Sequence, residues 1–337
     1  MKPLVQIPYV ALDGETPFAL LARFRAEALA LMKAARGTFG PASYLASAAL
    51  LPVLDALSWR WLEASFNPYR EEIYAIAREV GVPGAIALNV CFEWGCTGGV
   101  WGVGETVLLR RVLDWPFPRL GEMTVVARQT GPAGAFHNVT WPGFAGVLQA
   151  SAPGRFAAAI NQAPMKKRGL GFVGDWALNR LAVPRALPPA HLLRRAFETA
   201  PDYAAAKAML CQEPLAVPAI FILSGTRRGE GCVIERSERT FSLREIADGR
   251  VCAANHFVKP PEGRAHAWRA RPIDSKGRYA LARTLAGTED FSWFLPPIAN
   301  VNSRLALIAD AANGMLAVMG TMGARPSTEI FRLPINA

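Results

Sequence analysis

The hydrophobic pattern of this 337-residue chain changes near residue 96, and this change constrains the fold more than any other feature. After residue 96, short apolar runs alternate with Gly and Pro turns, a pattern typical of strands. Before it, apolar residues recur at helical spacing, first as the stripe Phe18, Leu21, Phe24, Ala28, Leu31 and Met32. We therefore expect a helical N-terminal segment over residues 1–95 and an α+β core over residues 96–337 with mostly antiparallel strands.

Three helices are expected in the first segment. Thr16 fits an N-cap, with Pro17 at the first helical position, because proline is favoured there. A second helix is expected from about Ala42 to Phe66. The third, Tyr69–Val80, should end at Gly81, because glycine accepts the left-handed conformation that closes many helices.

Strands and helices are expected to alternate after residue 96. Asn313-Gly314 is a tight-turn signal that predicts a hairpin between its flanking runs, although an Ala-rich helix is an alternative there. Helices are expected at His191–Thr199, Tyr203–Gln212 and Ser275–Leu285. Strands are expected at Thr106–Leu113, Met123–Ala127, Phe156–Ile160, Ala219–Leu223, Cys232–Glu235, Val251–Ala254, Asn302–Asp310 and Gly314–Met319.

Composition narrows the class of protein. Half of the residues are hydrophobic (51%) and 19% are charged, which excludes an intrinsically disordered chain. The net charge of +10 suits acidic substrates, anionic membranes or nucleic acid without choosing among them. Interleaved basic and aromatic motifs are missing, so we expect no nucleic acid partner. Gly37–Leu54 has no charged residue, and Pro41 and Pro52 argue against a spanning helix. Peripheral contact with an anionic membrane surface therefore stays open.

The first residues, MKPLVQIPYVALDGETP, contain no long apolar run, so we expect no signal peptide and a cytoplasmic protein. In a reducing compartment the five cysteines should be free thiols. Cys91 and Cys96 lie five residues apart, no CxxC pair occurs, and the four histidines are dispersed. We expect neither a metal site nor a cofactor.

Cys96 is the sharpest candidate for chemistry. It follows Gly95 and precedes Thr97-Gly98-Gly99, where a backbone without side chains can be approached closely. A buried structural cysteine at a strand start is the competing interpretation. Arg111 near this thiol would favour the thiolate, and Asp114 could bind an amine. On one strand these two side chains would face opposite sides, so the strand should end or bulge between them. An ordinary surface ion pair is the alternative.

Three later residues complete the candidate set. Asn161 and Asn255 each follow a short apolar run, where an amide could donate to an oxyanion or only form a turn. Arg278 falls in the first turn of the helix expected after Asp274, where an exposed arginine is the default.

Taken in order, these segments resemble the acid ceramidase and N-acylethanolamine acid amidase family of cysteine N-terminal-nucleophile hydrolases, which is related to bile salt hydrolases and penicillin V acylases. The resemblance covers about residues 7–320, with Asn255 and Arg278 in the places of the late Asn and Arg. The segments that carry it are Ile7–Asp13, Leu88–Thr97, Arg111–Trp115, Trp141–Asn161 and Phe221–Arg236.

The resemblance implies an αββα sandwich whose chain is cut autocatalytically between Gly95 and Cys96. Cys96 would then attack an N-acyl amide, with its new α-amine as the base and with a lipophilic acyl chain on the substrate. In this family's pattern, Arg111 orients Cys96 and Asp114 holds the amine. Asn255 and Asn161 form the oxyanion hole, and Arg278 braces Asn255 or binds the leaving group.

This chain departs from the family pattern at Gln162, at Ala254-Asn255-His256-Phe257 and in the spacing from Asp274 to Arg278. The departures leave two alternatives open: acyl transfer to an amine from the same acyl-enzyme, and a non-catalytic protein that binds lipid or a membrane surface. Trp59, Trp61 and Phe66 are available to line an acyl groove. The acyl chain, the leaving amine and the oligomeric state stay open.

Overall fold

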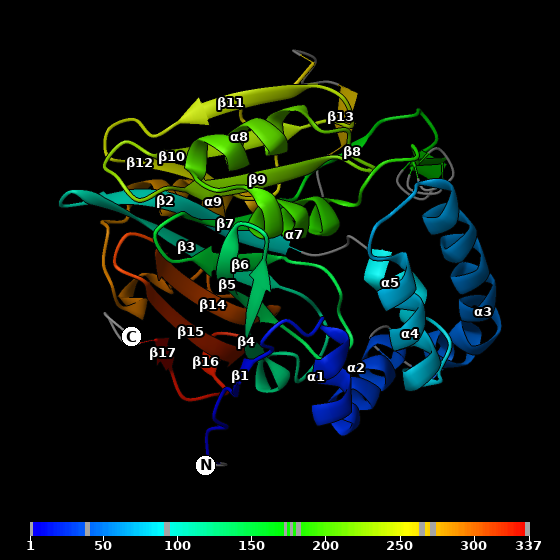
Figure 1. Cartoon of the computed structure of the whole chain (residues 1–337). Coiled ribbons are helices and arrows are strands. Elements are labelled where there is room, and N and C mark those ends of the chain that lie inside the picture. The colour runs from blue at the N-terminus through cyan, green and yellow to red at the C-terminus, as the bar shows by residue number, and fades with distance from the viewer. Residues whose placement is uncertain are drawn as a thin grey trace.

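The computed structural model describes residues 3–37, 41–90, 95–171, 174–175, 178–179, 183–262, 267–269 and 274–333. Its centre is a sandwich of two large sheets (Figure 1). The first sheet has eight strands, all antiparallel to their neighbours except β1, which pairs parallel with β4. Their order is β1 (Tyr9–Ala11), β4 (Val125–Gly131), β5 (Gly134–Thr140), β6 (Gln149–Ala152), β7 (Phe156–Gln162), β9 (Ala219–Ser224), β10 (Gly231–Arg236) and β11 (Phe241–Glu245).

The second sheet is antiparallel throughout. Its order is β12 (Arg250–Ala253), β2 (Gly95–Val103), β3 (Thr106–Asp114), β14 (Ser303–Asp310), β15 (Met315–Met322) and β16 (Arg325–Pro326), with β17 (Phe331–Leu333) also on β15. A small ribbon, β8 (Met165–Lys166) with β13 (Trp268–Arg269), stands apart. Cys96, Leu109 and Leu113 face the first sheet, and Leu108 and Val112 face the other way. This alternation places the main core between the sheets.

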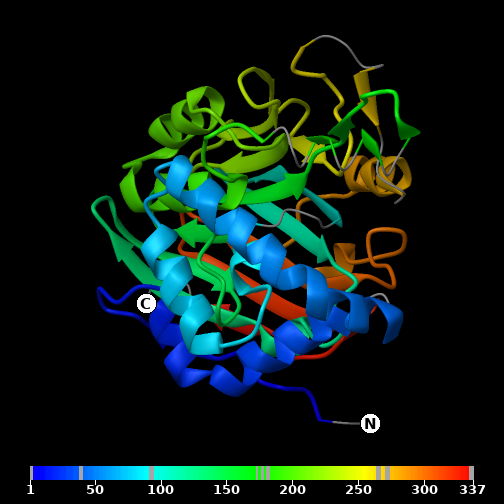
Figure 2. The same ribbon diagram turned by 90° about the vertical axis from the view of Figure 1, so that its right-hand side faces the viewer.

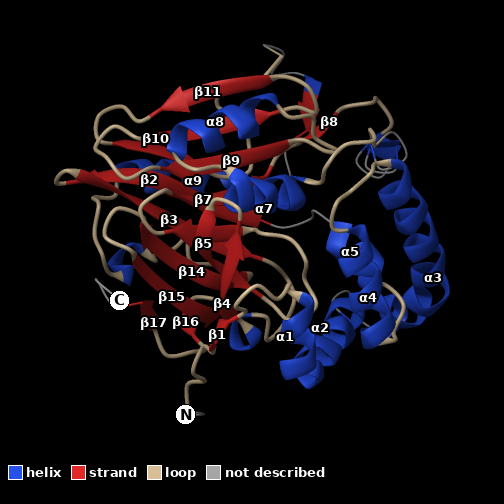
Figure 3. Cartoon of the chain, viewed as in Figure 1, coloured by secondary structure: helices blue, strands red, loops and turns tan. Residues whose placement is uncertain are grey.

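Helices cover both outer faces of the sandwich. Helices α7 (Pro189–Thr199) and α8 (Tyr203–Gln212) pack on the first sheet, and α9 (Ser275–Thr284) packs on β12 and β2 of the second. Figure 3 shows this arrangement by element type. The predicted αββα architecture is therefore confirmed.

The N-terminal helices lie along one side of the sandwich, as Figure 2 shows face-on. They share their own apolar core, which includes Leu62, Ile73 and Ile76. None of the helices within the described ranges is long and apolar enough to cross a membrane. Their bounds are α1 (Phe18–Arg23), α2 (Arg25–Gly37), α3 (Pro41–Ala64), α4 (Arg70–Val80) and α5 (Ala85–Val90).

The N-terminal helices form as predicted, but one helix start and the continuity of one helix differ from the prediction. Helix α4 ends at Gly81 with φ at +67°, as expected. The N-cap prediction was wrong: α1 starts at Phe18, Thr16 offers only its backbone carbonyl to Ala19, and no side chain caps the helix. The single expected stripe is split at Phe24 into α1 and α2.

Among the strands, the 302–319 hairpin is confirmed and its helical alternative is excluded, since β14 and β15 pair antiparallel across the turn. Met123 lies in a 3-10 turn (Gly121–Met123), so the expected Met123–Ala127 strand begins later, as β4 at Val125.

Candidate active site

Cys96 is the second residue of β2 and lies between the two sheets with no exposed surface. The glycines after it allow this close packing. A Cβ on Gly98 would lie 2.7 Å from the carbonyl oxygen of Arg110 and 2.8 Å from Cδ1 of Ile222. A Cβ on Gly99 would lie 2.5 Å from the carbonyl oxygen of Val251. Glycine is therefore needed at both positions for β2 to fit between its neighbours.

Arg111 contacts the sulfur directly. Its Nη2 donates to Sγ of Cys96 at 3.0 Å and to the carbonyl of Ile160 at 2.8 Å. Burial raises the pKa of the Cys96 thiol to about 11, although the guanidinium of Arg111 opposes this shift. In the continuous chain the sulfur is thus a neutral thiol at pH 7. The Nε and Nη1 atoms of Arg111 are buried without a partner in the described part of the chain.

Asp114 lies on the other face of β3. Its carboxylate accepts from Oγ of Ser303 at 2.7 Å and from Nη1 of Arg278 at 3.3 Å. Burial raises the pKa of Asp114, and the charge of Arg278 and the bond from Ser303 work against that rise.

The expected interruption between Arg111 and Asp114 is therefore not in β3, which pairs with β2 without a break. It is in the neighbouring strand β14, whose register shifts between Ser303 and Leu305. Asp114 thus reaches the surroundings of Cys96 through Arg278 on the α9 side and not through a bend of its own strand.

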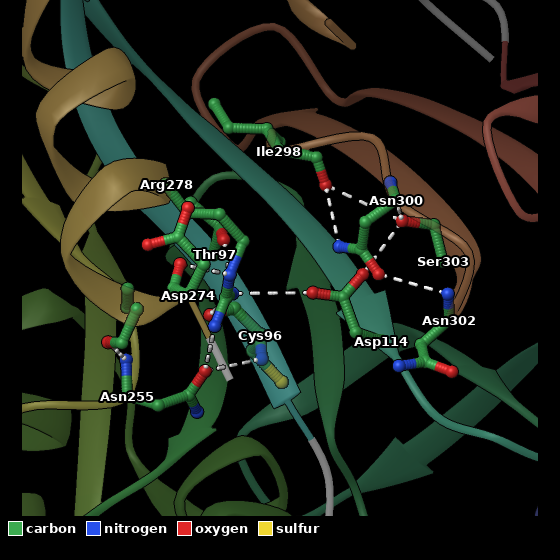
Figure 4. A network of polar contacts seen from close by, with 12 residues as sticks. Cys96, Thr97, Asp114, Asn255, Asp274, Arg278, Ile298, Asn300, Asn302 and Ser303 are labelled. Atoms are coloured by element: carbon green, nitrogen blue, oxygen red, sulfur yellow. Dashed lines mark hydrogen bonds and ion pairs between the residues drawn. The ribbon is translucent and has the colours of Figure 1, made fainter. Parts of the chain in front are cut away.

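Arg278, in the first turn of α9, is hydrogen-bonded to several residues of the site (Figure 4). Its Nη1 donates to the carbonyl oxygen of Cys96 and to Oγ1 of Thr97, both at 2.6 Å. Its Nη2 donates to Oδ1 of Asn255 at 2.8 Å, and its Nε donates to the carbonyl of Asp274 at 2.9 Å. The side chain is buried, so the default expectation of an exposed arginine is wrong here.

Asn255 contacts the preceding peptide group, the one that joins Gly95 to Cys96. Its Oδ1 accepts from the backbone N–H of Cys96 at 2.9 Å, and its Nδ2 donates to the carbonyl of Gln162 at 2.9 Å. The backbone N–H of Asn255 donates to Oγ of Ser275 at 2.7 Å. Asn255 is buried and immobilised at its side chain and at its backbone.

Asn161 is buried on β7, close to the end of β12. Its Nδ2 donates to the carbonyls of Ala253 and Ala254 at 3.3 and 3.1 Å, and its Oδ1 has no partner in the described residues. In this conformation, the side-chain nitrogen of Asn161 donates to carbonyls at the end of β12 and directly after it. Within the described residues, its side-chain oxygen is the atom left to accept from another partner.

The structure thus places five predicted residues in one hydrogen-bonded network and puts the sixth, Asn161, on β7 of the facing sheet. The sequence reasoning missed Thr97, Ser275 and Ser303, which complete the network. Ser275 begins α9, and no local sequence signal connects it to Asn255. Ser303 lies 189 positions from Asp114, and no local pattern connects them.

An apolar pocket lies between the N-terminal helices and the sandwich, and none of the network residues lines it. It encloses about 620 Å³, counting its mouth. Trp115, the residue after Asp114, is part of its wall, together with Leu31, Leu88, Phe144 and Leu148. The aromatic residues named as available for an acyl groove do not line this pocket: Trp59 and Trp61 pack in the helical core, and Phe66 is 83% exposed.

Cys96, Cys211, Cys232 and Cys252 are free thiols in the structure. Cys91, Glu93, Trp94 and His266 lie outside the described residues. In the ranges that are described, no group of three or more His, Cys, Asp or Glu side chains could hold a metal ion.

Comparisons with known proteins agree with this architecture. No family model matches the chain. Acid ceramidase of Balaenoptera acutorostrata scammoni is 32% identical over 197 residues, which are 52% of this chain and 49% of the relative. Acid ceramidase of Bos taurus is 31% identical over 193 residues, or 51% and 48% of the two chains. The chain thus spans about half the length of the curated relatives it matches.

Among solved structures, the N-acylethanolamine-hydrolyzing acid amidase ortholog of Caenorhabditis elegans superposes with a TM-score of 0.51 at 15% identity. The match covers 71% of this chain and all of the other. These findings confirm the resemblance of the sequence to acid ceramidases and the fold expected from it.

Proposed function

We propose that this chain is an amidohydrolase that cleaves N-acyl amides through a thioester on Cys96, after the peptide bond between Gly95 and Cys96 is cut. The observation that carries the proposal is the set of contacts around one residue. Its sulfur accepts from Arg111, its backbone N–H donates to Asn255, and its carbonyl accepts from Arg278. A cysteine held at all three functional atoms is oriented for chemistry rather than merely buried.

The cut would divide the chain into a helical segment, 1–95, and a core, 96–337. The thiol of Cys96 would attack the carbonyl carbon of Gly95, and breaking the C–N bond would leave a thioester and a free α-amine. Water would then release the thioester as the carboxylate of Gly95 and restore the thiol. Asn255 would hold the N–H of the scissile amide, and Arg278 would hold the carbonyl of the following amide, during this shift.

In turnover, the new α-amine would take the thiol proton. Its reference pKa of about 7.7–8.0 suits a base near neutral pH. The thiolate would attack the substrate carbonyl, and the leaving amine would take the proton back. Asn255 Oδ1 already accepts from the N–H of Cys96 and would hold the ammonium form, with the carboxylate of Asp114 connected to Cys96 through Arg278.

Asn255 Nδ2 would donate to the oxyanion, where one lost donor typically costs about 10²–10³ in rate. Asn161, whose Nδ2 donates to Ala253 and Ala254, would have to turn to join it.

The apolar pocket supports a lipophilic acyl chain as the substrate class. Its walls are almost entirely hydrocarbon, and one of them includes Trp115, the residue directly after Asp114. An apolar lining with few polar groups favours an apolar ligand. The same pocket lies between the proposed fragments, so binding there would require both of them.

The decisive experiment is intact mass with N-terminal sequencing of purified protein, alongside an acyl-amide assay. We expect two fragments, the larger beginning at Cys96, and release of free fatty acid. Cys96→Ala should stay uncut and inactive. Cys252→Ala, which removes another buried thiol on the adjacent strand β12, is the matched control and should be cut normally. Turnover by a folded Cys96→Ala protein would end the proposal.

Acyl transfer to an amine acceptor is the second candidate, favoured by the departure at His256, the residue after Asn255. It shares the acyl-enzyme and differs in what attacks it. Product analysis with and without a primary amine separates the two, because a transferase forms a new amide at the expense of the free acid.

A contact with a membrane surface is a further proposal, suited to a basic cytoplasmic protein with lipophilic substrates. Helix α3 exposes four apolar residues at helical spacing: Leu50, Val53, Leu54 and Leu57. Co-sedimentation with phosphatidylserine vesicles should fall with added salt and with Leu54→Glu. If this binding is the whole function, the protein will stay uncut and will release no acid.

A further inference from the structure

His256 follows Asn255 and is linked to it through a third residue. Nδ1 of His256 lies 2.7 Å from Oγ of Ser275, and the same Oγ accepts from the backbone N–H of Asn255 at 2.7 Å. One serine hydroxyl therefore connects the imidazole to the backbone of the proposed oxyanion residue. The proposed mechanism uses neither His256 nor Ser275.

The hydrogens available limit the direction of this chain. The Asn255 N–H can only donate, so Ser275 Oγ is an acceptor in that bond. The hydroxyl has one hydrogen, and Nδ1 of a neutral imidazole can accept it. Oγ of Ser275 has two lone pairs, so a protonated Nδ1 can also donate to it. In the other neutral tautomer, with the imidazole proton on Nε2, the bonds run from Asn255 N–H to Ser275 Oγ and from Ser275 O–H to His256 Nδ1.

The surroundings keep the imidazole neutral, as an acceptor at Nδ1 requires. Burial lowers the pKa of His256, and the positive charges of Lys276, Arg244 and Arg278 lower it further. The carboxylate in this region, Glu235, is paired with Arg244 and accepts from the backbone of residues 258 and 259. The ring of Tyr279 meets the imidazole edge-on, with 5.2 Å between centroids.

Helix α9 thereby holds Asn255 at two points. Ser275 and Arg278 are three residues apart and share one face of the helix. Ser275 binds the backbone of Asn255, and Arg278 binds its side-chain oxygen. The orientation of Nδ2 depends on both contacts, and in the Nε2-protonated tautomer the serine contact in turn depends on an acceptor at residue 256.

We propose that His256 is a positioning residue: by accepting from Ser275, it fixes that hydroxyl toward Asn255 and so aims the Asn255 amide at the developing oxyanion. The proposal rests on the function proposed above. It makes His256 an acceptor in the site without direct contact with the substrate.

Two variants distinguish the loss of the hydrogen-bond acceptor at residue 256 from the loss of its aromatic ring. His256→Phe keeps an aromatic ring against Tyr279 and removes the acceptor. His256→Asn removes the ring but places Oδ1 where Nδ1 was. The assay uses 7-amino-4-methylcoumarin amides of acetic, octanoic and lauric acid, with kcat counted per mole of the Cys96-initiated fragment, so that incomplete cutting does not distort it.

We expect kcat of His256→Phe to fall about tenfold, the effect of one lost hydrogen bond, with KM unchanged within about twofold. His256→Asn should recover most of that loss, and the thermal midpoints of the two variants should not follow their kcat values. A merely structural role predicts the reverse, with activity following stability and with the ring-preserving Phe variant the better of the two.

The outcomes distinguish this inference from the function on which it rests. If the wild type releases coumarin and His256→Phe keeps its kcat, this inference is wrong and the proposed function stands. If the wild type stays uncut and cleaves none of the three amides, both are overturned.

Discussion

The guanidinium of Arg278 lies within hydrogen-bond distance of the carbonyl of Cys96 and also pairs with the carboxylate of Asp114, both of them buried. One cation therefore balances an acid and orients the backbone of the proposed nucleophile. A buried charge left without its partner is strongly destabilising. Removing the charge of Asp114 together with that of Arg278 therefore separates the effect of Arg278 on stability from its effect on Cys96.

Replacing Arg278 with Met should abolish cutting and lower the free energy of unfolding by about 3–5 kcal/mol, because the buried Asp114 loses its cation. The double variant Arg278→Met/Asp114→Asn should regain much of that stability and remain uncut. Urea denaturation and gel analysis of the same samples measure the two effects. Equal stability of the single and double variants would contradict the pairing.

Cys96 should be unreactive before the cut and reactive after it. In the continuous chain its thiol is fully buried with a pKa of about 11, so little thiolate exists at pH 8. In a partly processed sample, brief iodoacetamide treatment should label Cys96 only in the cut molecules. Cys232, which is buried on β10 in either form, is the internal control. Equal labelling of cut and uncut Cys96 would refute this expectation.

Stability should fall in acid because of His191. Its Nδ1 accepts from Asn67, and burial lowers its pKa to about 3. The unfolded chain binds the proton near pH 6.5 and the folded chain does not, so stability is present above pH 6.5 and is lost as pH falls toward 3.

This histidine adds a slope of up to about 1.4 kcal/mol per pH unit in that window. His191→Leu should be less stable at pH 8 but should lose less on acidification. His137, whose pKa burial lowers to about 4, accounts for part of the slope that remains. Denaturation curves at pH 8, 6 and 5 test the difference; parallel pH profiles for the two proteins would exclude His191 as a cause.

Gly98→Ala should cost about 1–3 kcal/mol through overpacking and should slow cutting, because the new methyl would press on the backbone of Arg110 and on Ile222. Gly102→Ala on the same strand is the matched control, since its Cβ would meet nothing nearer than 3.6 Å. Thermal melts and a time course of fragment appearance compare them. Equal effects from the two alanines would show that close packing at Gly98 is unimportant.

Leu88→Trp should shift the preferred acyl chain toward shorter lengths, because Leu88 lines the apolar pocket and a larger side chain would fill it. The ratio of kcat/KM for lauroyl over acetyl amides is the measure, and it should fall at least tenfold. Leu57→Trp, on the exposed face of α3, should leave that ratio unchanged. An unchanged ratio in the Leu88 variant would place the acyl chain elsewhere.

Most of the sandwich could be predicted from the sequence, because alternation and turn residues are local signals. The hairpin at Asn313-Gly314 and the end of α4 at Gly81 are such cases. The break at Phe24 could not be predicted, since the apolar stripe continues through it and only packing divides the two helices.

In the candidate site, too, some residues could be predicted from the sequence and others could not. Cys96, Arg111 and Asp114 stand within 19 positions of one another in a recognisable order. Ser275 and Ser303 are ordinary serines in the sequence, and their partners are fixed only when α9 and β14 pack beside β2 and β3. The bulge in β14 was likewise invisible, because the strand expected to bend was its neighbour.

Strand β1 lies before the proposed cut, yet it is hydrogen-bonded in parallel to β4, with Tyr9 opposite Val126 and Ala11 opposite Arg128. Val5 forms a further bridge to Thr328 near the other end of the chain. After the cut, the N-terminal fragment would therefore stay bound to the sheet through backbone hydrogen bonds, as in donor-strand complementation. Loss of the fragment would remove the edge strand β1 from the first sheet. Cutting between Gly95 and Cys96 would therefore create a two-chain protein and release no propeptide.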